Sequence, residues 1–349
     1  MPFNRSPWNP LIPPQAVKPS RSDFKVVCVF NAGVIRHHGQ VLLLLRVAEK
    51  PIPTSPELEL VPVYDACAGQ ITVKAFRRDD PECDFSDPRF VRSRGEQYLS
   101  SLSHIRLARS TDGIHFQVED HPAMAPSNLY ESYGIEDPRI VFIDGIHYIA
   151  YSAISPLGSA IALASTTDFI SYDRHGIILC PDNRDVEIFP EKINGSYYAL
   201  HRPNSGEYGR REIWLAESPD LLHWGRHRRV MGTREHFWDS GRVGGSTIPI
   251  RTERGWLEIY HGADQNNRYC LGAVLLDAEA PWRVLARSNQ PLMQPEADYE
   301  VNGFFGNVLF TCGALAEEGK IKMYYGAADT SLCYAEILIA DILSQLAGI

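Results

Sequence analysis

The chain of 349 residues carries 34 basic and 43 acidic side chains, which gives a formal net charge of −9 at pH 7. Its basic residues occur in short pairs such as Arg77-Arg78 and Arg228-Arg229 and never in long runs, so we expect no nucleic-acid partner. No apolar stretch approaches the roughly 18–20 residues of a membrane span, and the polar start Met1-Pro2-Phe3-Asn4-Arg5 lacks the apolar core of a signal peptide. We therefore expect a cytoplasmic protein with no membrane partner.

The cysteines support the same location. They are seven, an odd number, and no two of them form a Cys-x-x-Cys pair. This pattern is typical of reduced, mostly buried thiols rather than of a disulfide framework. Because no metal-ligand spacing is present either, we expect no bound metal and no cofactor.

The first elements along the chain are an irregular arm and a buried strand. Prolines at positions 2, 7, 10, 13, 14 and 19 interrupt regular backbone hydrogen bonding, so we predict an irregular N-terminal arm over residues 1–22. Residues 40–46 form an apolar run that is typical of a buried strand.

A turn glycine followed by a strand-like run then recurs through the chain. These glycines stand at positions 95, 145, 195, 255 and 319. Glycine after Asn or Asp between two such runs indicates a hairpin, because a tight turn needs positive φ. A four-stranded propeller blade takes roughly 40–50 residues, so the five units predict an all-β fold, a five-bladed β-propeller, as a single domain over residues 1–349. We expect the run at 40–46 to close the ring with the C-terminal segment.

One motif in this repeat concentrates charge. Gly134-Ile135-Glu136-Asp137-Pro138-Arg139-Ile140 places two carboxylates and a guanidinium at the start of a predicted strand, and a weaker copy, Ser86-Asp87-Pro88-Arg89-Phe90, lies upstream. In a structural interpretation Asp caps a turn, Pro fixes φ and Arg pairs with a neighbouring blade, and we favour it for Asp87. The additional Glu136 indicates that the chemistry lies at the second copy.

Propeller blades direct their first strands at a central channel, so polar residues at those strand starts share one funnel. Unpaired charges there cost desolvation free energy, and their convergence therefore indicates function. Simpler interpretations stay open, since Lys192 could form a surface ion pair with Glu191 and the histidines could be satisfied core residues. The candidates are Asn31, Arg46, Arg89, Glu136, Asp137, Arg139, Lys192, His201, Arg202, Tyr260, His261 and Asp329.

These motifs resemble glycoside hydrolase family 130. The resemblance is carried by Phe30-Asn31-Ala32-Gly33-Val34, Gly134–Ile140, Leu200-His201-Arg202-Pro203 and Gly255-Trp256-Leu257-Glu258-Ile259-Tyr260-His261-Gly262, and matches run in the family's order from Asn9 to Asp329. It implies a five-bladed propeller and, as in most characterised members, inverting phosphorolysis of β-mannosides. One departure is Ala32, where some members carry Pro, which should affect loop stiffness more than chemistry.

The resemblance also implies roles for the candidates. Asp137 would be the general acid, acting through the mannose 3-hydroxyl, while inorganic phosphate as co-substrate attacks C1 from the opposite face and yields α-mannose 1-phosphate. Glu136 would tune the pKa of this acid or bind sugar. The phosphate pocket would consist of Lys192, His201, Arg202, Tyr260 and His261; Asn31, Arg46 and Asp329 would hold the mannosyl hydroxyls, and Arg89 and Arg139 would position the acid.

Two other functions remain open from the sequence. An inverting mannosidase would need a second carboxylate to activate water, and a propeller could bind sugar without catalysis. Mannose, glucose and N-acetylglucosamine all occur as acceptors in the family, and we favour a 1,2-linked β-mannoside. The segments expected to choose the acceptor are 120–131 and 234–242. A second copy of the chain is a further partner that the sequence leaves open.

Overall fold

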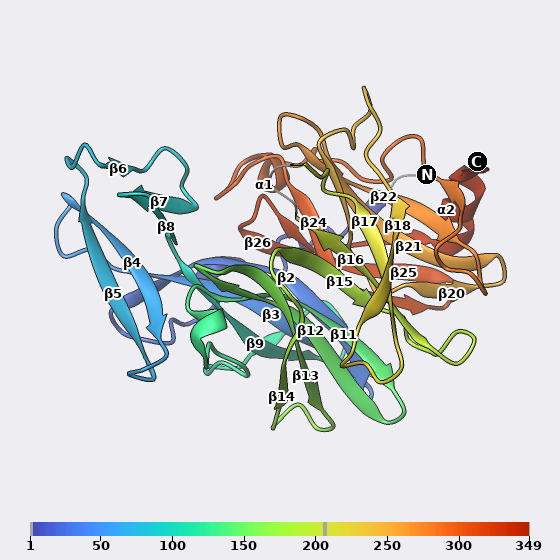
Figure 1. Cartoon of the computed structure of the whole chain (residues 1–349), viewed down its shortest axis with the longest axis horizontal. Coiled ribbons are helices and arrows are strands. Elements are labelled where there is room, and N and C mark those ends of the chain that lie inside the picture. The colour runs from blue at the N-terminus through green and yellow to red at the C-terminus, as the bar shows by residue number, and fades with distance from the viewer. Residues whose placement is uncertain (1–2, 205–207, 349) are drawn as a thin grey trace.

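The computed structural model describes residues 3–204 and 208–348, and nearly all of its regular elements are β-strands. They build the predicted five-bladed β-propeller (Figure 1). The first blade consists of β2 (Phe24–His37), β3 (Gln40–Pro51), β9 (Leu102–Ser110) and β10 (Gln117–Val118), and the second of β11 (Gly134–Ile143), β12 (Ile146–Ser155), β13 (Gly158–Thr166) and β14 (Asp173–Leu179). The third blade consists of β15 (Asn183–Ile188), β16 (Tyr197–Pro203), β17 (Ile213–Ser218) and β18 (Gly225–Met231), and the fourth of β19 (Arg242–Gly245), β20 (Ile250–Thr252), β21 (Gly255–Ala263), β22 (Tyr269–Leu276) and β23 (Val284–Arg287). The fifth blade consists of β24 (Leu309–Glu317), β25 (Lys320–Ala327) and β26 (Ser331–Leu338) together with β1 (Asn4–Arg5).

The first repeat differs from the prediction. In the first blade the turn between the two inner strands lies at His38-Gly39, between β2 and β3. Gly95 instead lies in a hairpin of an insertion between β3 and β9. A hairpin has the same local sequence signals in a blade and in an insertion, so spacing alone misassigned this unit.

The insertion projects from the propeller body at the left of Figure 1. It carries two small sheets, and the upstream Asp87-Pro88-Arg89 copy lies in a loop between two strands of the second sheet. Its strands are β4 (Leu58–Asp65) with β5 (Gln70–Arg77), and β6 (Cys83–Asp84) with β7 (Phe90–Ser93) and β8 (Glu96–Leu99).

The ring is closed by the N-terminal arm. β1 pairs antiparallel with β26, so the start of the chain supplies the outer strand of the last blade. Residues 40–46, predicted to close the ring, lie within β3 between β2 and β9 of the first blade, and that prediction was wrong. The predicted arm is otherwise irregular apart from the 3-10 turn η1 (Pro14–Ala16), while Met1 and Pro2 lie outside the described residues.

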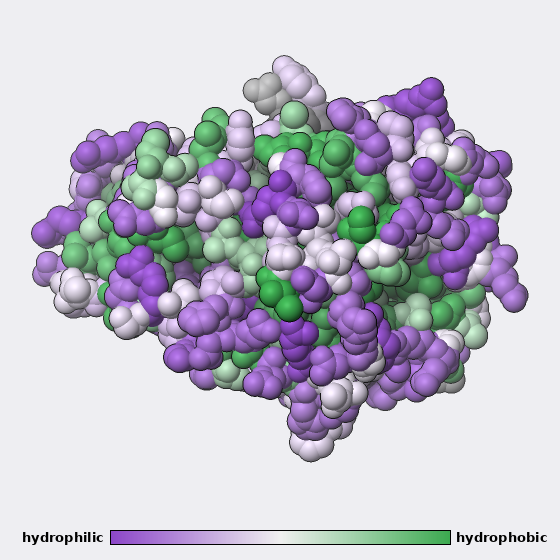
Figure 2. Space-filling model, turned by 90° about the horizontal axis from the view of Figure 1, so that it is seen from below, coloured by the Kyte–Doolittle hydropathy of each residue, from purple (hydrophilic) through white to green (hydrophobic). Residues whose placement is uncertain are grey.

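Short helices complete the described chain: η2 (Leu129–Glu131), α1 (Asp298–Val301) and α2 (Ile339–Gln345), after which β27 (Ala347–Gly348) pairs with β23. Within the described ranges, no helix is both long and apolar enough to cross a membrane. Hydrophilic side chains cover much of the face in Figure 2, and apolar ones form separate patches. All seven cysteines are free thiols, and four of them are buried.

Candidate active site

Three consecutive blades place a polar residue at the same bulge of the inner strand. The pairing register shifts between Phe30 and Gly33 in β2, between Glu136 and Arg139 in β11, and between Arg184 and Glu187 in β15. A bulge adds a residue on one strand and redirects its side chain. The bulge residues Asn31, Asp137 and Asp185 have φ of 47°, 53° and 54°, a left-handed conformation that Asn and Asp tolerate better than most residues.

This geometry identifies the true counterpart of Asp137. It is Asp185 on the next blade, in Arg184-Asp185-Val186-Glu187-Ile188, and not Asp87 in the insertion. Asp185 was not among the residues predicted from the sequence, although it precedes the turn glycine Gly195 much as Asp137 precedes Gly145.

The bulges face a cavity of about 380 Å³ whose wall combines blade residues with the insertion. Eight of the twelve predicted residues lie in this wall: Asn31, Arg46, Arg89, Glu136, Asp137, Arg202, His261 and Asp329. The structure does not place Arg139, Lys192, His201 or Tyr260 there.

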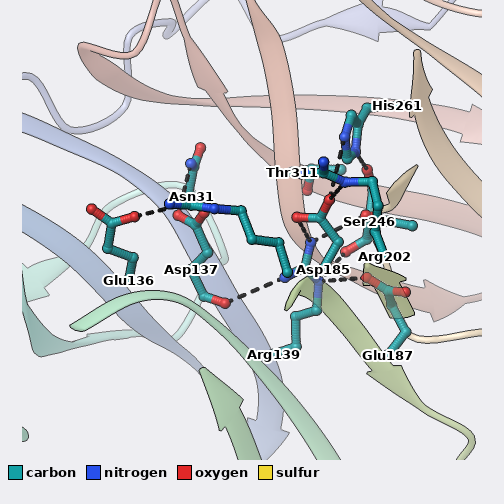
Figure 3. A network of polar contacts seen from close by, with 12 residues as sticks. Asn31, Glu136, Asp137, Arg139, Asp185, Glu187, Arg202, Ser246, His261 and Thr311 are labelled. Atoms are coloured by element: carbon teal, nitrogen blue, oxygen red, sulfur yellow. Dashed lines mark hydrogen bonds and ion pairs between the residues drawn. The ribbon is translucent and has the colours of Figure 1, made fainter. Parts of the chain in front are cut away.

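Arg46 organises the acidic end of the cavity, where Asn31, Glu136 and Asp137 lie close together (Figure 3). Its guanidinium donates from Nη1 to Asp137 Oδ1 at 2.9 Å and from Nη2 to Glu136 Oε1 at 2.6 Å. Asn31 Nδ2 donates to the same Asp137 oxygen at 2.9 Å. Both hydrogen bonds to the Asp137 side chain fall on Oδ1. In the described part of the chain, Asp137 Oδ2 therefore remains available to a ligand.

Two more charged residues of this wall are positioned by neighbours. Burial and the nearby Asp137 carboxylate raise the pKa of Asp329 to about 6, against the opposing effect of Arg46. Arg89 donates to Asp87 at 2.7 Å and lies 4.0 Å from the centre of the Phe305 ring. Asp87 therefore orients a cavity residue, in keeping with the structural role that we favoured for it.

Another part of the cavity wall is cationic and contains two arginines that were not predicted from the sequence, Arg211 and Arg242. Arg242 donates to two neutral groups, the Tyr269 hydroxyl and Asn267 Oδ1, each at 2.7 Å. Burial lowers the pKa of the Arg242 guanidinium, and nearby arginines, Arg211 among them, lower it further. Its Nε has no hydrogen-bond partner in the part of the chain that the structure describes. Charged donors without carboxylate partners suit an oxyanion.

Arg202 and His261 extend this wall around Asp185. Arg202 Nε donates to Asp185 Oδ2 at 2.5 Å, and His261 Nε2 lies 3.5 Å from the same oxygen. Burial lowers the pKa of His261 to about 3, so its imidazole is neutral at pH 7.

The structure places three of the predicted phosphate ligands outside the wall of this cavity. Lys192 is exposed on the turn between β15 and β16, 4.7 Å from the centre of the Tyr197 ring. His201 contacts Asn183 Oδ1 at 3.2 Å and His227 Nδ1 at 3.0 Å. Side chains alternate along a strand, so His201 points away from the wall that Arg202 lines.

Tyr260 follows the same rule next to His261 on β21. Its buried hydroxyl donates to Asp239 Oδ2 at 2.9 Å and accepts from Arg287 Nε at 3.0 Å. The residue is therefore part of a structural network behind the cavity and does not reach it.

Arg139 lies buried beneath the cavity and supports the bulges (Figure 3). It lies 2.9 Å from Glu187 Oε1 and donates to the backbone carbonyls of Gly245 and Ser246 at 3.1 and 3.0 Å. Burial raises the pKa of both Glu187 and its neighbour Glu258 well above the ordinary range. Arg139 thus positions strands from three blades and does not contact the cavity.

One propeller cavity thus brings a pair of carboxylates held by Arg46 together with a group of arginines, an arrangement expected of an enzyme that cleaves a sugar with an anionic co-substrate. A family model described as beta-1,4-mannooligosaccharide phosphorylase matches residues 87–347. The chain belongs to that family, glycoside hydrolase family 130, which confirms the resemblance seen in its motifs.

Individual relatives agree with this assignment. A beta-1,2-mannobiose phosphorylase of Listeria innocua serovar 6a is 51% identical over 97% of this chain and 96% of its own length. The solved structure of a Listeria innocua beta-1,2-mannobiose phosphorylase in complex with beta-1,2-mannobiose superposes with a TM-score of 0.97, covering 99% of both chains at 50% identity. A 1,2-beta-oligomannan phosphorylase of Thermoanaerobacter sp. is 41% identical over 70% of this chain and 82% of its own length.

Proposed function

We propose that the protein is an inverting phosphorylase of 1,2-linked β-mannosides, which releases α-mannose 1-phosphate and a sugar shortened by one residue. The observation that carries this proposal is the cationic wall of Arg202, Arg211 and Arg242, which faces the same cavity as Asp137. An attacking phosphate needs such a wall because it brings its own negative charge. The named activities of the relatives support the linkage.

In the proposed reaction Asp137 donates its proton to the departing glycosidic oxygen, directly or through the 3-hydroxyl of the mannosyl group. The bond from C1 to that oxygen breaks while a phosphate oxygen bonds to C1 from the opposite face, which inverts the configuration. Asn31, Arg46 and Asp329 would hold the mannosyl hydroxyls. Glu136, fixed by Arg46 and by Arg184 at 3.3 Å, would bind sugar.

The competing function, hydrolysis, needs a carboxylate that is free to activate water. The carboxylate that lies within the cationic wall is Asp185, but its oxygens are occupied by Arg202, His261 and, at 3.7 Å, Arg139. Burial would raise the pKa of Asp185, yet these neighbours hold it below the ordinary value. Asp185 thus serves better as the anchor of the cationic wall than as a base.

We propose that inorganic phosphate is the co-substrate and that no metal or other cofactor takes part. A cytoplasmic location suits seven free thiols and a supply of phosphate.

The proposal is tested by supplying α-mannose 1-phosphate with mannose, glucose or N-acetylglucosamine and following phosphate release against acceptor-free controls. We expect release with mannose and a 1,2-linked product. In the cleavage direction β-1,2-mannobiose should be consumed only when phosphate is present; release of free mannose without phosphate would instead establish a hydrolase. Asp137→Asn should lower kcat by roughly 10²- to 10⁴-fold, and full activity in that variant would refute the acid assignment.

A further inference from the structure

Two strand glycines lie at the borders between blades, where a bulge residue of the neighbouring blade comes close. Gly244 belongs to β19 of the fourth blade and faces Asp185 of the third. Gly326 belongs to β25 of the fifth blade and faces Asn31 of the first. Neither glycine has φ in the left-handed region, so the backbone conformation does not require glycine at either position. A glycine within a strand often marks the close approach of another group.

A side chain at position 244 would collide with the anchor of the cationic wall. A Cβ atom there would lie less than 3.0 Å from Asp185 Oδ2 and from two atoms of the His261 ring. Both side chains are buried, and Asp185 Oδ2 accepts from Arg202 Nε at 2.5 Å, so neither can move without a loss (Figure 3). An alanine at position 244 would therefore displace Asp185 and His261, and Arg202 with them.

A side chain at position 326 would collide with the group that holds the acid. A Cβ atom there would lie less than 3.0 Å from Asn31 Oδ1 and 3.1 Å from Phe30 Cβ. Asn31 is buried, and its Nδ2 donates to Asp137 Oδ1 at 2.9 Å. Rotation of the Asn31 amide away from an alanine would lengthen or break this hydrogen bond, so the change would reach Asp137.

We infer that Gly244 and Gly326 are positioning residues, one for each partner in the reaction, although neither lines the cavity. Gly244 acts on phosphate through Asp185 and His261. Gly326 acts on proton donation to the mannoside through Asn31. This inference rests on the proposed phosphorolysis and adds to it a separate structural control of each substrate.

The test replaces each glycine by alanine and measures both substrates. Gly244→Ala should raise the KM for phosphate by about tenfold, the loss expected for one hydrogen bond to a charged group, and leave the KM for β-1,2-mannobiose within about twofold. Gly326→Ala should lower kcat/KM for β-1,2-mannobiose at saturating phosphate by about tenfold and leave the KM for phosphate within about twofold. A general loss of stability would not divide the two substrates in this way.

Gly225→Ala is the matched control. Gly225 begins β18, the outer strand of the third blade, and a Cβ atom there would meet no atom within 4 Å. This variant should keep the kinetic constants of the wild type within about twofold.

A double variant tests whether Gly326 acts through Asn31. Asn31→Ala removes the amide oxygen that a Cβ atom at position 326 would meet. In that background Gly326→Ala should lower kcat/KM by less than about twofold further, because contacting sites are not additive. A further tenfold loss would overturn the role given to Gly326.

Phosphate binding is also measured without turnover, as the rise in thermal midpoint when phosphate is added. This rise should be smaller in Gly244→Ala than in the wild type and unchanged in Gly326→Ala. Equal effects of the two variants on both substrates, or no effect of either, overturn the inference and leave phosphorolysis standing. A variant that fails to fold overturns the role of its glycine, which would then serve the fold. If the wild type does not cleave β-1,2-mannobiose with phosphate, the proposed function itself fails.

Discussion

At the residue scale, side-chain direction separates the cations that reach the cavity from those that do not. Arg202 and His201 are adjacent in sequence, as are His261 and Tyr260, yet only one member of each pair lines the cavity. The family motifs include both members of each pair. Because side chains alternate along a strand, only one of the two can point into the cavity.

A comparison of two cations tests this distinction. Arg242→Gln removes a buried guanidinium from the cationic wall, and we expect the KM for phosphate to rise by roughly 10- to 100-fold, the range for a hydrogen bond to a charged group. Lys192→Ala removes an exposed cation of the resemblance-based set and should leave that KM within about twofold, since it lies outside the cavity. Phosphate saturation curves at fixed mannoside measure both, and a larger effect at Lys192 would contradict the structure.

At the scale of elements, buried charged side chains connect strands of neighbouring blades beneath the site. Arg139 of β11 contacts Glu187 of β15, and Glu258 of β21 is buried beside them. Burial raises the pKa of both carboxyls, and the Arg139 guanidinium opposes this at each of them. Because Arg139 Nε lies 2.9 Å from Glu187 Oε1, we infer that Glu187 is its main ion-pair partner.

Replacing each carboxyl by its neutral amide checks this inference. Glu258→Gln should change the free energy of unfolding by less than about 1 kcal/mol at pH 7, since Oε1 still accepts from the Ser246 N–H at 3.0 Å. Glu187→Gln leaves Arg139 with only the more distant carboxylate of Asp185, at 3.7 Å, and should cost about 3 kcal/mol. Urea denaturation measures both, and equal losses would show that Glu187 is not the main partner of Arg139.

At the scale of the whole molecule, stability depends on the closure of the ring by the N-terminus. Arg5 of β1 donates to the fully buried Glu300 at 2.7 Å and to the backbone carbonyl of Gln294 at 2.7 Å. Burial opposes the ionisation of Glu300, but the bond from Arg5 and backbone N–H groups hold its pKa below the ordinary 4.5. A carboxyl with a lowered folded-state pKa stabilises the fold above its unfolded pKa, and this stability is lost as pH falls through the folded pKa.

Arg5→Ala should therefore lower the free energy of unfolding by about 3 kcal/mol at pH 7. The deficit relative to the wild type should shrink as pH falls from 4.5, the ordinary pKa that applies in the unfolded chain, through the lower folded-state pKa of Glu300. Thermal unfolding at pH 7 and at pH 4 checks both statements. Lys18→Ala, which removes a solvent-exposed ion pair with Asp120 in the same arm, is the control and should change little. A pH-independent deficit for Arg5→Ala would exclude the proposed linkage.

The sequence predicted the fold well because a propeller repeats one local unit. Hairpin turns at Gly145, Gly195, Gly255 and Gly319 are local signals, and all four lie between paired blade strands. The two wrong predictions concern elements whose place in the fold does not follow from their order in the sequence. Gly95 belongs to an insertion, and the ring is closed by two residues, Asn4 and Arg5, whose partner lies more than 300 positions away.

By itself the sequence determined the β-propeller, the family and the motif that holds Asp137, because turn chemistry and motif order are properties of short segments. Only the tertiary structure decided that Asp185 is the counterpart of Asp137, and that Arg211 and Arg242 join Arg202 in one wall while Lys192, His201 and Tyr260 stay outside it. The physical reason is that a bulge and the alternation of side chains along a strand set where each group points. Closure of the ring then brings those directions together in a single cavity.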